Sequence, residues 1–478
     1  MSAPGVTSEI IEHSPSGFAA PSTANAMVVG YTEKGPTDEP QLVTSKAHFV
    51  SLFGGRVAYG YVYDAVEAFF EEGGAVIYVQ RLVGPTPVSA TANIFDAAGS
   101  TAPGDVALVA TAKSPGDWAN SLNVEVVASG GNFTIAVSHD DDGVLETSPS
   151  LADRAEAVTW FANNSDYITL ALGASAEDPR TQGPTGLASG DDDRGNVTET
   201  EIEAAWEKFT KDYGPGQVGM PGFTSDAAHE AVLAHAHAFR RIPHLDLVDT
   251  ATAATLITAA DGLRDTAGHR FTGVFDRWAT VPADAAGTTK TIPYSAIQMG
   301  MTGHSEGSGK TVGDPVAGAN GISKWAVGLA QPEWSEADRE LLADAGVNVA
   351  RVMGGAVRTY DYVTLANQIS DPNWVPLNGA RVICAIAHEA EQVGENHVLK
   401  KIDGRKKTIN DFIGDVIGIC KRYFEADDLF GETPEDAFTV TDTNTPETIA
   451  ENKLRCGISA ATAGFGRYVE IEITKEAS

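Results

Sequence analysis

The chain has 478 residues, of which 42% are hydrophobic, and its formal net charge is −32. This length predicts about two to four domains of roughly 100–200 residues each, and the apolar fraction excludes a disordered chain. The acidity argues against a nucleic-acid partner, because binding a phosphate backbone requires a basic face.

The sequence contains no recognisable targeting segment and no clustered cysteines. The start, MSAPGVTSEI, lacks the basic and apolar regions of a signal peptide, and no apolar run reaches the roughly 20 residues that span a bilayer. We therefore expect a protein that is made and kept in a cytoplasm unless it is released as part of a larger particle, and that does not insert into a membrane. Cys384, Cys420 and Cys456 are far apart, which favours reduced thiols over a disulfide framework or a zinc site. No cofactor is expected.

The first third of the chain changes character twice. Residues 1–20 are rich in Pro, Gly and Ser and predict an extended arm. Residues 21–95 predict α/β structure: a strand at AMVVGY, a helix that stops at Gly73 and a strand at AVIYVQRL. Residues 96–196 hold short strand-like runs between turn signals and predict an inserted β-rich domain. The acidic clusters at residues 140–142 and 191–193 predict solvated loop tips.

Residues 197–350 return to alternating helices and strands, with Ser225 as a plausible N-cap and HLDLVD as a strand. Together with residues 21–95, this pattern predicts a doubly wound α/β domain, whose mainly parallel sheet has helices on both faces. Residues 281–325 are rich in Gly and Pro and predict a long irregular loop.

Residues 351–478 predict a separate α+β domain. ARVICAIAHEAEQV suggests a strand that runs into a helix, and TINDFIGDVIGICKRYFEADDL has the apolar stripe of an amphipathic helix. Thr408 with Asp411 resembles a capping box, and Lys421 and Arg422 fall late in this helix. The end, RYVEIEITK, alternates apolar and polar residues and predicts a half-buried strand.

The stretch GHSEGSGKT contains two partial motifs. Its GHSEG fits the nucleophile elbow of serine hydrolases, but an elbow needs a strand before Ser305 and a helix after it, and glycines follow instead. Its GSGKT resembles a phosphate-binding loop, but His304 replaces the first glycine of that motif. We predict a mobile surface loop and no enzyme, and keep a hydrolase using Ser305 as an alternative.

Histidines crowd one segment without predicting a metal site. His235 lies on an apolar helical stripe, and His237 points to another face because residues two apart diverge on a helix. We therefore expect His235 to be packed in the core, and we expect no metal site to be shared among His229, His235, His237 and His244.

One basic run stands out in this acidic chain. KKIDGRKK contributes Lys400, Lys401, Arg405, Lys406 and Lys407, directly before the amphipathic helix. Two interpretations remain open: a solvated turn, or a surface for an anionic protein partner that Lys421 and Arg422 extend.

The order of motifs along the whole chain resembles the tail sheath proteins of contractile bacteriophages and of related contractile injection systems. The matching stretches are the PGV arm, VVGYTEKGP, FFEEGGAVIYVQRL, SPGDWANSLNVEV, VAGANGISKWAVG, GVNVARVMGG, ENHVLKKIDG and the region from TINDF to the final strand.

This resemblance implies a structural, self-assembling subunit. Such proteins stack as rings around a tail tube and contract to drive the tube through a cell envelope. The implied partners are further copies, the tube protein, and baseplate and terminator proteins, in a virion tail assembled in a bacterial host cytoplasm. A tail-associated receptor-binding protein is the remaining alternative, suggested by the β-rich insertion.

The resemblance also implies site residues. The segment around residues 400–425 would face the tube, through the basic run together with Lys421 and Arg422. Terminal arms would exchange strands between subunits, through Pro4, Gly5, Val6, Glu9, Ile10 and Ile11 at one end and Tyr468, Val469, Glu470, Ile471, Glu472 and Ile473 at the other.

Overall fold

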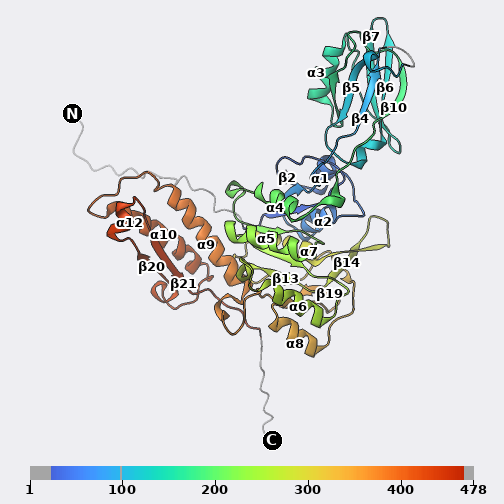
Figure 1. Ribbon diagram of the computed structural model, residues 1–478. Helices are drawn as coiled ribbons and strands as arrows, with labels where there is room; N and C mark the ends of the chain where they lie inside the picture. The colour runs from blue at the N-terminus through green and yellow to red at the C-terminus, as the bar shows by residue number, and fades with distance from the viewer. Residues whose placement is uncertain (1–22, 97–99, 468–478) are drawn as a thin grey trace, which may run out of the picture.

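The computed structural model describes residues 23–96 and 100–467. Figure 1 shows three regions: a central α/β region, a β-rich region on a narrow neck, and a helical region that contains the C-terminal elements. No helix in the described parts is long and apolar enough to cross a bilayer.

The central region is built on a seven-stranded sheet in the order β17-β13-β12-β11-β1-β3-β2. Its strands are β1 (Ala26–Gly30), β2 (Gln41–Val43), β3 (Ile77–Arg81), β11 (Gln217–Gly219), β12 (Ile242–Asp246), β13 (Gly273–Phe275) and β17 (Val347–Asn348). All neighbours are parallel except β2 and β3. The predicted, mainly parallel sheet is confirmed.

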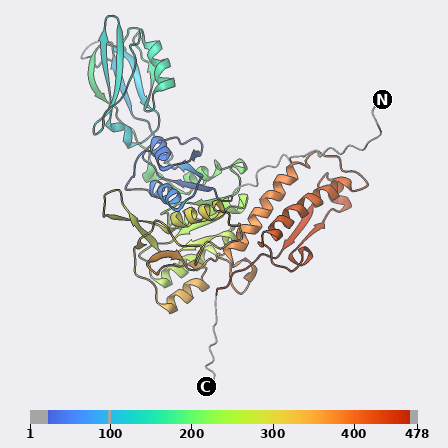
Figure 2. The same cartoon turned by 180° about the vertical axis from the view of Figure 1, so that it is seen from behind.

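Helices cover both faces of this sheet. Alternate side chains of β1 point to opposite faces, so each face needs an apolar cover. Ala26 and Val28 pack with the helices on one face, and Met27 and Val29 pack with those on the other. The first face carries α1 (Lys46–Phe53), α2 (Val62–Glu72) and α7 (Tyr294–Gly307), which lie toward the viewer in Figure 2; the second carries α4 (Glu199–Glu207), α5 (Asp226–Phe239), α6 (Ala253–Leu263) and α8 (Glu336–Asp344).

The predicted loop over residues 281–325 is wrong in part, because α7 lies inside it. Gly300 and Gly303 suggested a broken helix, yet they permit close packing. A Cβ on Gly300 would lie 2.7 Å from the Cβ of Glu72, and one on Gly303 would lie 3.1 Å from the ring of Phe69. These glycines therefore let α7 approach α2 closely. The same stretch contains β15 (Thr289–Pro293), which pairs with β14 (Trp278–Pro282).

The β-rich region contains two antiparallel sheets over one apolar core. One sheet joins β4 (Thr91–Phe95), β5 (Val106–Ala112) and β9 (Ile168–Leu172); the other joins β10 (Gln182–Gly186), β6 (Leu122–Ser129), β7 (Asn132–His139) and β8 (Gly143–Thr147). β4 precedes residue 96, the expected start of the insertion, and pairs with β5. The region also holds a helix, α3 (Arg154–Asn164), which the sequence analysis did not predict.

The C-terminal elements pack two long helices, α9 (Leu377–Glu395) and α10 (Lys407–Glu425), against a hairpin of β20 (Phe438–Asp442) and β21 (Cys456–Ala460). The strand predicted at ARVIC is wrong: these residues belong to α9, whose first half is buried against the central region. Smaller elements are β16 (Gly328–Leu329), β18 (Ala350–Met353), β19 (Ala356–Thr359), α11 (Pro434–Ala437) and α12 (Pro446–Ala450).

His244 on β12 is a buried polar group where α9 meets the sheet. Its side chain is 1% exposed, and neither ring nitrogen has a hydrogen-bond partner among the described residues. Burial, and to a smaller degree the charge of Arg381, lower its pKa to about 3. Because the folded pKa lies below the unfolded value of about 6.5, His244 favours folding above pH 6.5 and loses that contribution as the pH falls.

Replacing His244 with leucine should therefore weaken the acid sensitivity of the fold. Between pH 7 and pH 5, the free energy of unfolding should fall by about 2 kcal/mol less in His244→Leu than in the natural chain. Denaturant titrations at both pH values measure this difference. The same replacement at the exposed His237 is the control; equal pH dependence of the His244 variant and the natural chain would contradict the assignment.

Candidate assembly site

The hairpin of β20 and β21 is an incomplete sheet. Five residue pairs join its strands, from Phe438 with Ala460 to Asp442 with Cys456. Within residues 23–96 and 100–467, neither strand has a second strand as a partner. Each outer edge therefore offers backbone donors and acceptors to an added strand.

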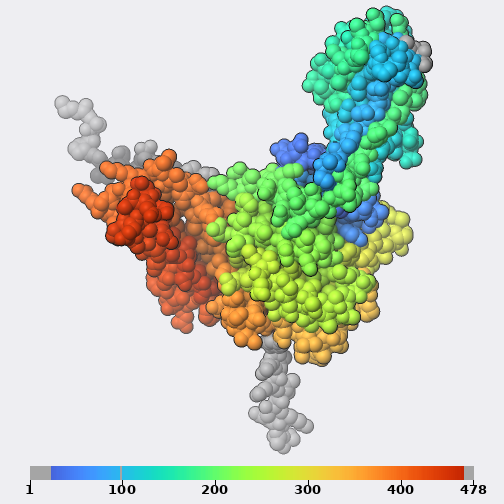
Figure 3. Space-filling model, viewed as in Figure 1, coloured from blue at the N-terminus to red at the C-terminus, as the bar shows by residue number. Residues whose placement is uncertain are grey.

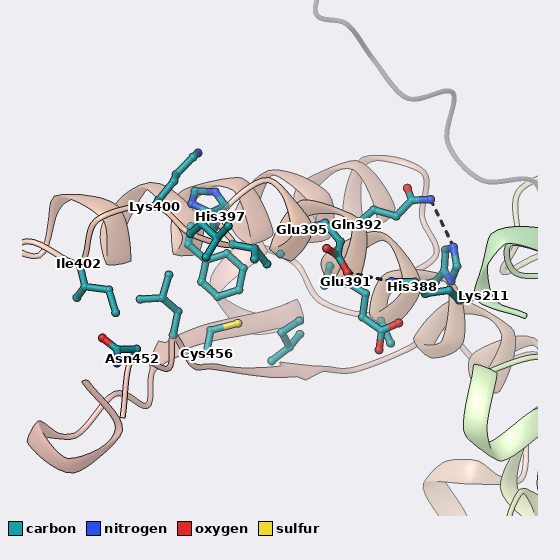
Figure 4. Close-up of a pocket in the computed structure, with 18 of the residues that line it drawn as sticks. Lys211, His388, Glu391, Gln392, Glu395, His397, Lys400, Ile402, Asn452 and Cys456 are labelled. Carbon is teal, nitrogen blue, oxygen red and sulfur yellow. Dashed lines mark hydrogen bonds and ion pairs between the residues drawn. The ribbon is translucent and has the colours of Figure 1, made fainter. Parts of the chain in front are cut away.

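An open groove of about 1680 Å³ lies beside β21 (Figure 4). Its walls include side chains of α9 and of β21, but none of β20, so it lies on the β21 side of the hairpin. Along β21, Cys456, Ile458 and Ala460 share one face. Ala460 packs against the core beneath the hairpin, whereas Cys456 and Ile458 line the groove. The apolar layer between the hairpin and α9 is therefore only partly filled.

Charged side chains close the groove where it meets the central region. Lys211 pairs with Glu395 at 3.2 Å, and Arg240 pairs with Glu391. Both pairs are exposed at the surface, so each stabilises the seam by only ~0–1 kcal/mol. The groove floor, by contrast, is apolar and includes Phe412 and Leu454.

The basic run forms the turn between α9 and α10, and Asp403 organises it. The Asp403 carboxylate accepts backbone N–H bonds from Arg405, Lys407 and Thr408 at 2.9–3.2 Å, which lowers its pKa. The predicted capping box of Thr408 and Asp411 is wrong, because the helix begins at Lys407 and the Thr408 hydroxyl donates to the carbonyl of Lys401. Asp403 accepts the Thr408 N–H, which Asp411 would have bound in the predicted box.

Only part of the basic run is available to a partner. Lys406 pairs with Asp442 at 3.0 Å and Lys407 with Asp411 at 3.7 Å. Lys400, Lys401 and Arg405 are exposed and have no ion pair within the described structure. In Figure 4, Lys400 points away from β21. These three cations face solvent.

The two late cations of α10 differ from each other. Arg422 pairs with Glu389 of α9, and the Tyr423 hydroxyl donates to the same carboxylate at 2.8 Å. Lys421 is exposed and has no ion pair in the residues described. Lys407 and Lys421 are fourteen residues apart, about 21 Å along the helix. The late cations therefore do not form one compact patch with the basic run.

Two apolar residues next to the basic run are also exposed. Val398 is 59% exposed and Leu399 is 100% exposed. Leu399 has a φ of 63°, a left-handed conformation that is unusual for a branched side chain. This arrangement could not be predicted from the sequence, because Leu normally marks a core position.

The two predicted linking arms lie outside the described residues. This applies to Pro4, Gly5, Val6, Glu9, Ile10 and Ile11 and to Tyr468, Val469, Glu470, Ile471, Glu472 and Ile473. The structure describes the surface to which such arms could add a strand, which is the β20–β21 hairpin with its groove.

Ser305 does not have the geometry of a nucleophile. It lies in the last turn of α7, 6% exposed, and not on a turn between a strand and a helix. Lys310 follows the C-terminal end of α7, so GSGKT does not precede a helix N-terminus as a phosphate-binding loop does. Neither partial motif has the structural context that its chemistry requires.

The segment around these motifs instead connects the central region to the C-terminal elements, so the predicted mobile loop is wrong here. The Glu306 carboxylate pairs with the buried guanidinium of Arg381 on α9. Asp428 accepts the hydroxyl of Thr311 at 2.5 Å and the backbone N–H of Gly313 at 3.0 Å. A Cβ on Gly313 would lie 2.3 Å from the Asp428 carboxylate, so glycine is needed there.

Three of the clustered histidines, His229, His235 and His244, are buried in separate surroundings, whereas His237 is exposed. His229 contacts the carbonyls of Phe223 and Asp246, and His235 lies 2.7 Å from Arg241 and beside Trp206. In the described residues, the one acidic or histidine cluster close enough to hold an ion is Asp117, Asp191 and Asp192. Asp192 was predicted to be solvated, but it is 2% exposed and pairs with Arg194 at 2.7 Å.

Comparison with known proteins identifies the fold. No family model and no curated protein matches the chain. The sheath tail protein from Desulfitobacterium hafniense is 14% identical, with a TM-score of 0.63 over 92% of this chain and 93% of that one. The sheath tail protein from Listeria innocua is 12% identical, with a TM-score of 0.62 over 88% of each chain. The contracted helical sheath of the anti-feeding prophage is 13% identical, with a TM-score of 0.58 over 100% of both chains.

These similarities extend over nearly the whole chain, and they confirm the resemblance found in the sequence. The chain therefore has the contractile tail sheath fold. Sheath tail proteins and the sheaths of contractile injection systems both have this fold.

Proposed function

We propose that this protein is a tail sheath subunit that polymerises as stacked rings around a tail tube and contracts to drive the tube through a target envelope. The observation that carries this proposal is the incomplete hairpin sheet beside an open apolar groove. A surface of this kind needs an added strand, which a neighbouring copy can supply. Baseplate and terminator proteins would complete a virion tail, assembled in the host cytoplasm.

Strand exchange would join the subunits. Residues 1–20 would form one linking arm, and the alternation of Val469, Ile471 and Ile473 with glutamates would let the other arm bury one face. Main-chain hydrogen bonds to a hairpin edge would provide the joint, and the alternating side chains would fix its register. Such a joint tolerates rotation of the subunits while they stay linked.

The remaining parts of the chain have separate roles in this proposal. Residues 21–95 and 197–350 would form the α/β domain, residues 96–196 the insertion, and residues 351–478 the domain nearest the tube. Contraction would move these packed parts as bodies, with the linking strands as hinges. No catalytic role is included, since Ser305 is buried at a helix end.

The tube-facing surface would combine the basic run with the exposed face of α10. Lys400, Lys401, Arg405, Lys406, Lys407, Lys421 and Arg422 were expected there, and the first three together with Lys421 are not neutralised within the described chain. Exposed ion pairs are weak individually, so they can guide assembly and still separate during contraction.

Removing residues 1–12 should leave a folded protein that cannot polymerise, because the linking strand would be missing. Circular dichroism measures the fold, and negative-stain microscopy shows whether sleeves form. A chain in which a Gly/Ser segment of equal length replaces residues 1–12 should behave like the deletion, and Ser8→Ala should assemble normally. Normal sleeves from the deletion would contradict strand exchange through this arm.

Reversing two free cations, Lys401→Glu with Arg405→Glu, should weaken assembly on the tube while leaving the free energy of unfolding unchanged within about 0.5 kcal/mol. The defect relative to the natural chain should shrink as the ionic strength rises, because salt screens both the attraction of the natural cations and the repulsion of the introduced carboxylates. Co-sedimentation with tube protein measures assembly. Lys453→Glu, an exposed cation on the same region, is the control. If the double variant assembles on the tube as well as the natural chain does, the basic run has no role in tube binding.

The exposed face of α10 contains Gly414 and Gly418, and a Cβ on either would meet no atom within 4 Å. Replacing both with glutamine should raise the free energy of unfolding by up to about 1 kcal/mol each, because glycine is a poor helix former. If this face lies against the tube, the added side chains should nevertheless reduce assembly. A stabilised variant that assembles as well as the natural chain would show that the face is free.

A further inference from the structure

The β-rich region stands on a neck made of two chain segments (Figure 3). The first follows β3 and leads to β4, and the second leads from β10 back to α4. Two crossing segments alone would allow the region to swing. The contacts around the neck show instead that several charged side chains fix it.

The two segments pair with each other at their backbones. Val88 and Asp191 exchange hydrogen bonds of 2.7 and 2.9 Å, and Gly84 donates to the carbonyl of Asp192 at 2.9 Å. A Cβ on Gly84 would lie 2.0 Å from the carbonyl oxygen of Asp193, and one on Gly190 would lie 2.5 Å from that of Gly116. Glycine therefore permits a spacing that no other residue would allow.

Arg81 is the central cation of the neck. Its side chain is 0% exposed and donates to the carbonyls of Gly35 at 3.2 Å and Pro115 at 2.8 Å. Its guanidinium also lies 3.8 Å from the Asp192 carboxylate. Because Gly35 belongs to the central region and Pro115 to the β-rich region, one buried side chain contacts both.

Arg194 is a second cation, on the outer side of the neck. Its guanidinium binds Asp192 at 2.7 Å and Asp117 at 2.9 Å, and it lies 3.9 Å above the ring of Tyr59. Tyr59 precedes α2 in the central region, whereas Asp117 belongs to the β-rich region. Arg194 therefore also connects the two regions.

Lys34 is the third cation. Its ammonium group lies 5.4 Å from the ring centre of Trp118 and 5.0 Å from that of Tyr167. Both rings belong to the β-rich region, whereas Lys34 follows β1. Cation–π contacts of this kind contribute about 0.5–1 kcal/mol each at exposed sites and more where water is excluded.

The motif SPGDWANSL supplies the matching surface. The Ser114 hydroxyl accepts the backbone N–H of Gly35 at 3.1 Å, and the Asn120 side chain exchanges hydrogen bonds of 2.8 and 2.9 Å with Gly190. With Pro115, Asp117 and Trp118, this short segment provides most contacts on the β-rich side. Its role is thereby structural and local to the neck.

We propose that Lys34, Arg81 and Arg194 lock the β-rich region at one orientation, so that it moves with the central region as a single body. They are positioning residues for the whole insertion. The lock goes beyond the proposed sheath role, since it concerns one chain and holds whether or not the chain polymerises.

Hydrogen–deuterium exchange of the full-length protein tests the lock. In the natural chain, the amides of residues 82–90 and 187–193 should be protected, unlike those of the exposed hairpin loop at residues 283–288. In Lys34→Met combined with Arg194→Ala, exchange in the neck should become about tenfold faster, because two contacts between the regions are lost. Exchange in β1 and β5 should not change, which shows that both regions remain folded.

A substitution elsewhere in the β-rich region is the control. Arg180→Ala removes an exposed arginine within the β-rich region and should leave the neck protected. If the double variant exchanges in the neck at the natural rate, or if the natural neck exchanges as fast as residues 283–288, the cations do not lock the insertion. Arg81 is left unchanged because a variant at a 0% exposed side chain could fail to fold.

Discussion

The arrangement of the chain depends on one buried ion pair, between Glu306 at the end of α7 and Arg381 in the first half of α9. The Arg381 side chain is 2% exposed, and it also donates to the Tyr362 hydroxyl at 3.2 Å and the Asp314 carbonyl at 3.3 Å. A buried charge that loses its partner destabilises a protein by about 3–5 kcal/mol. The pair therefore fixes where the C-terminal helices leave the α/β core, and with it the position of the hairpin and the groove.

The molecule contains two opposite kinds of surface: one whose groups pair within the chain, and one whose strand edges are open. At the neck and around Arg381, charged side chains pair within the chain, and glycines allow backbones to approach closely. At the hairpin of β20 and β21, backbone groups on the outer edges lack strand partners in the described residues. The first arrangement holds the parts of one chain together, and the second suits the proposed contacts between copies.

Much of the fold could be predicted from the sequence because its signals are local. The apolar run of β1, the glycine after α2, the Ser225 cap and the stripe of α10 each depend on neighbouring residues. The failures depend on distant partners. Gly300 and Gly303 suggested a loop because α2, against which they pack, is over 200 residues away in the chain.

The candidate site was predictable only in outline. The basic run was visible, but its neutralisation by Asp442 and Asp411 requires the fold. Asp192 looked like one acid of a solvated triplet, since nothing near it in sequence indicated the buried Arg81. The groove left no pattern in the sequence, because its walls come from segments as distant as Lys211, α9 and β21. The neck motif SPGDWANSL could be placed by resemblance at the entry to the inserted β domain, but its contacts with Gly35, Arg81 and Arg194 require the fold.

The open hairpin has a consequence for the proposed sheath subunit while it is still a single chain. Free strand edges beside an apolar groove favour indiscriminate pairing, and native proteins counter this hazard with charge. A formal net charge of −32 makes copies repel one another at long range. In the proposed sheath, a linking segment that matches the edge in hydrogen bonding and side-chain alternation would overcome that repulsion at short range. The acidity of the chain would thereby favour specific assembly over aggregation.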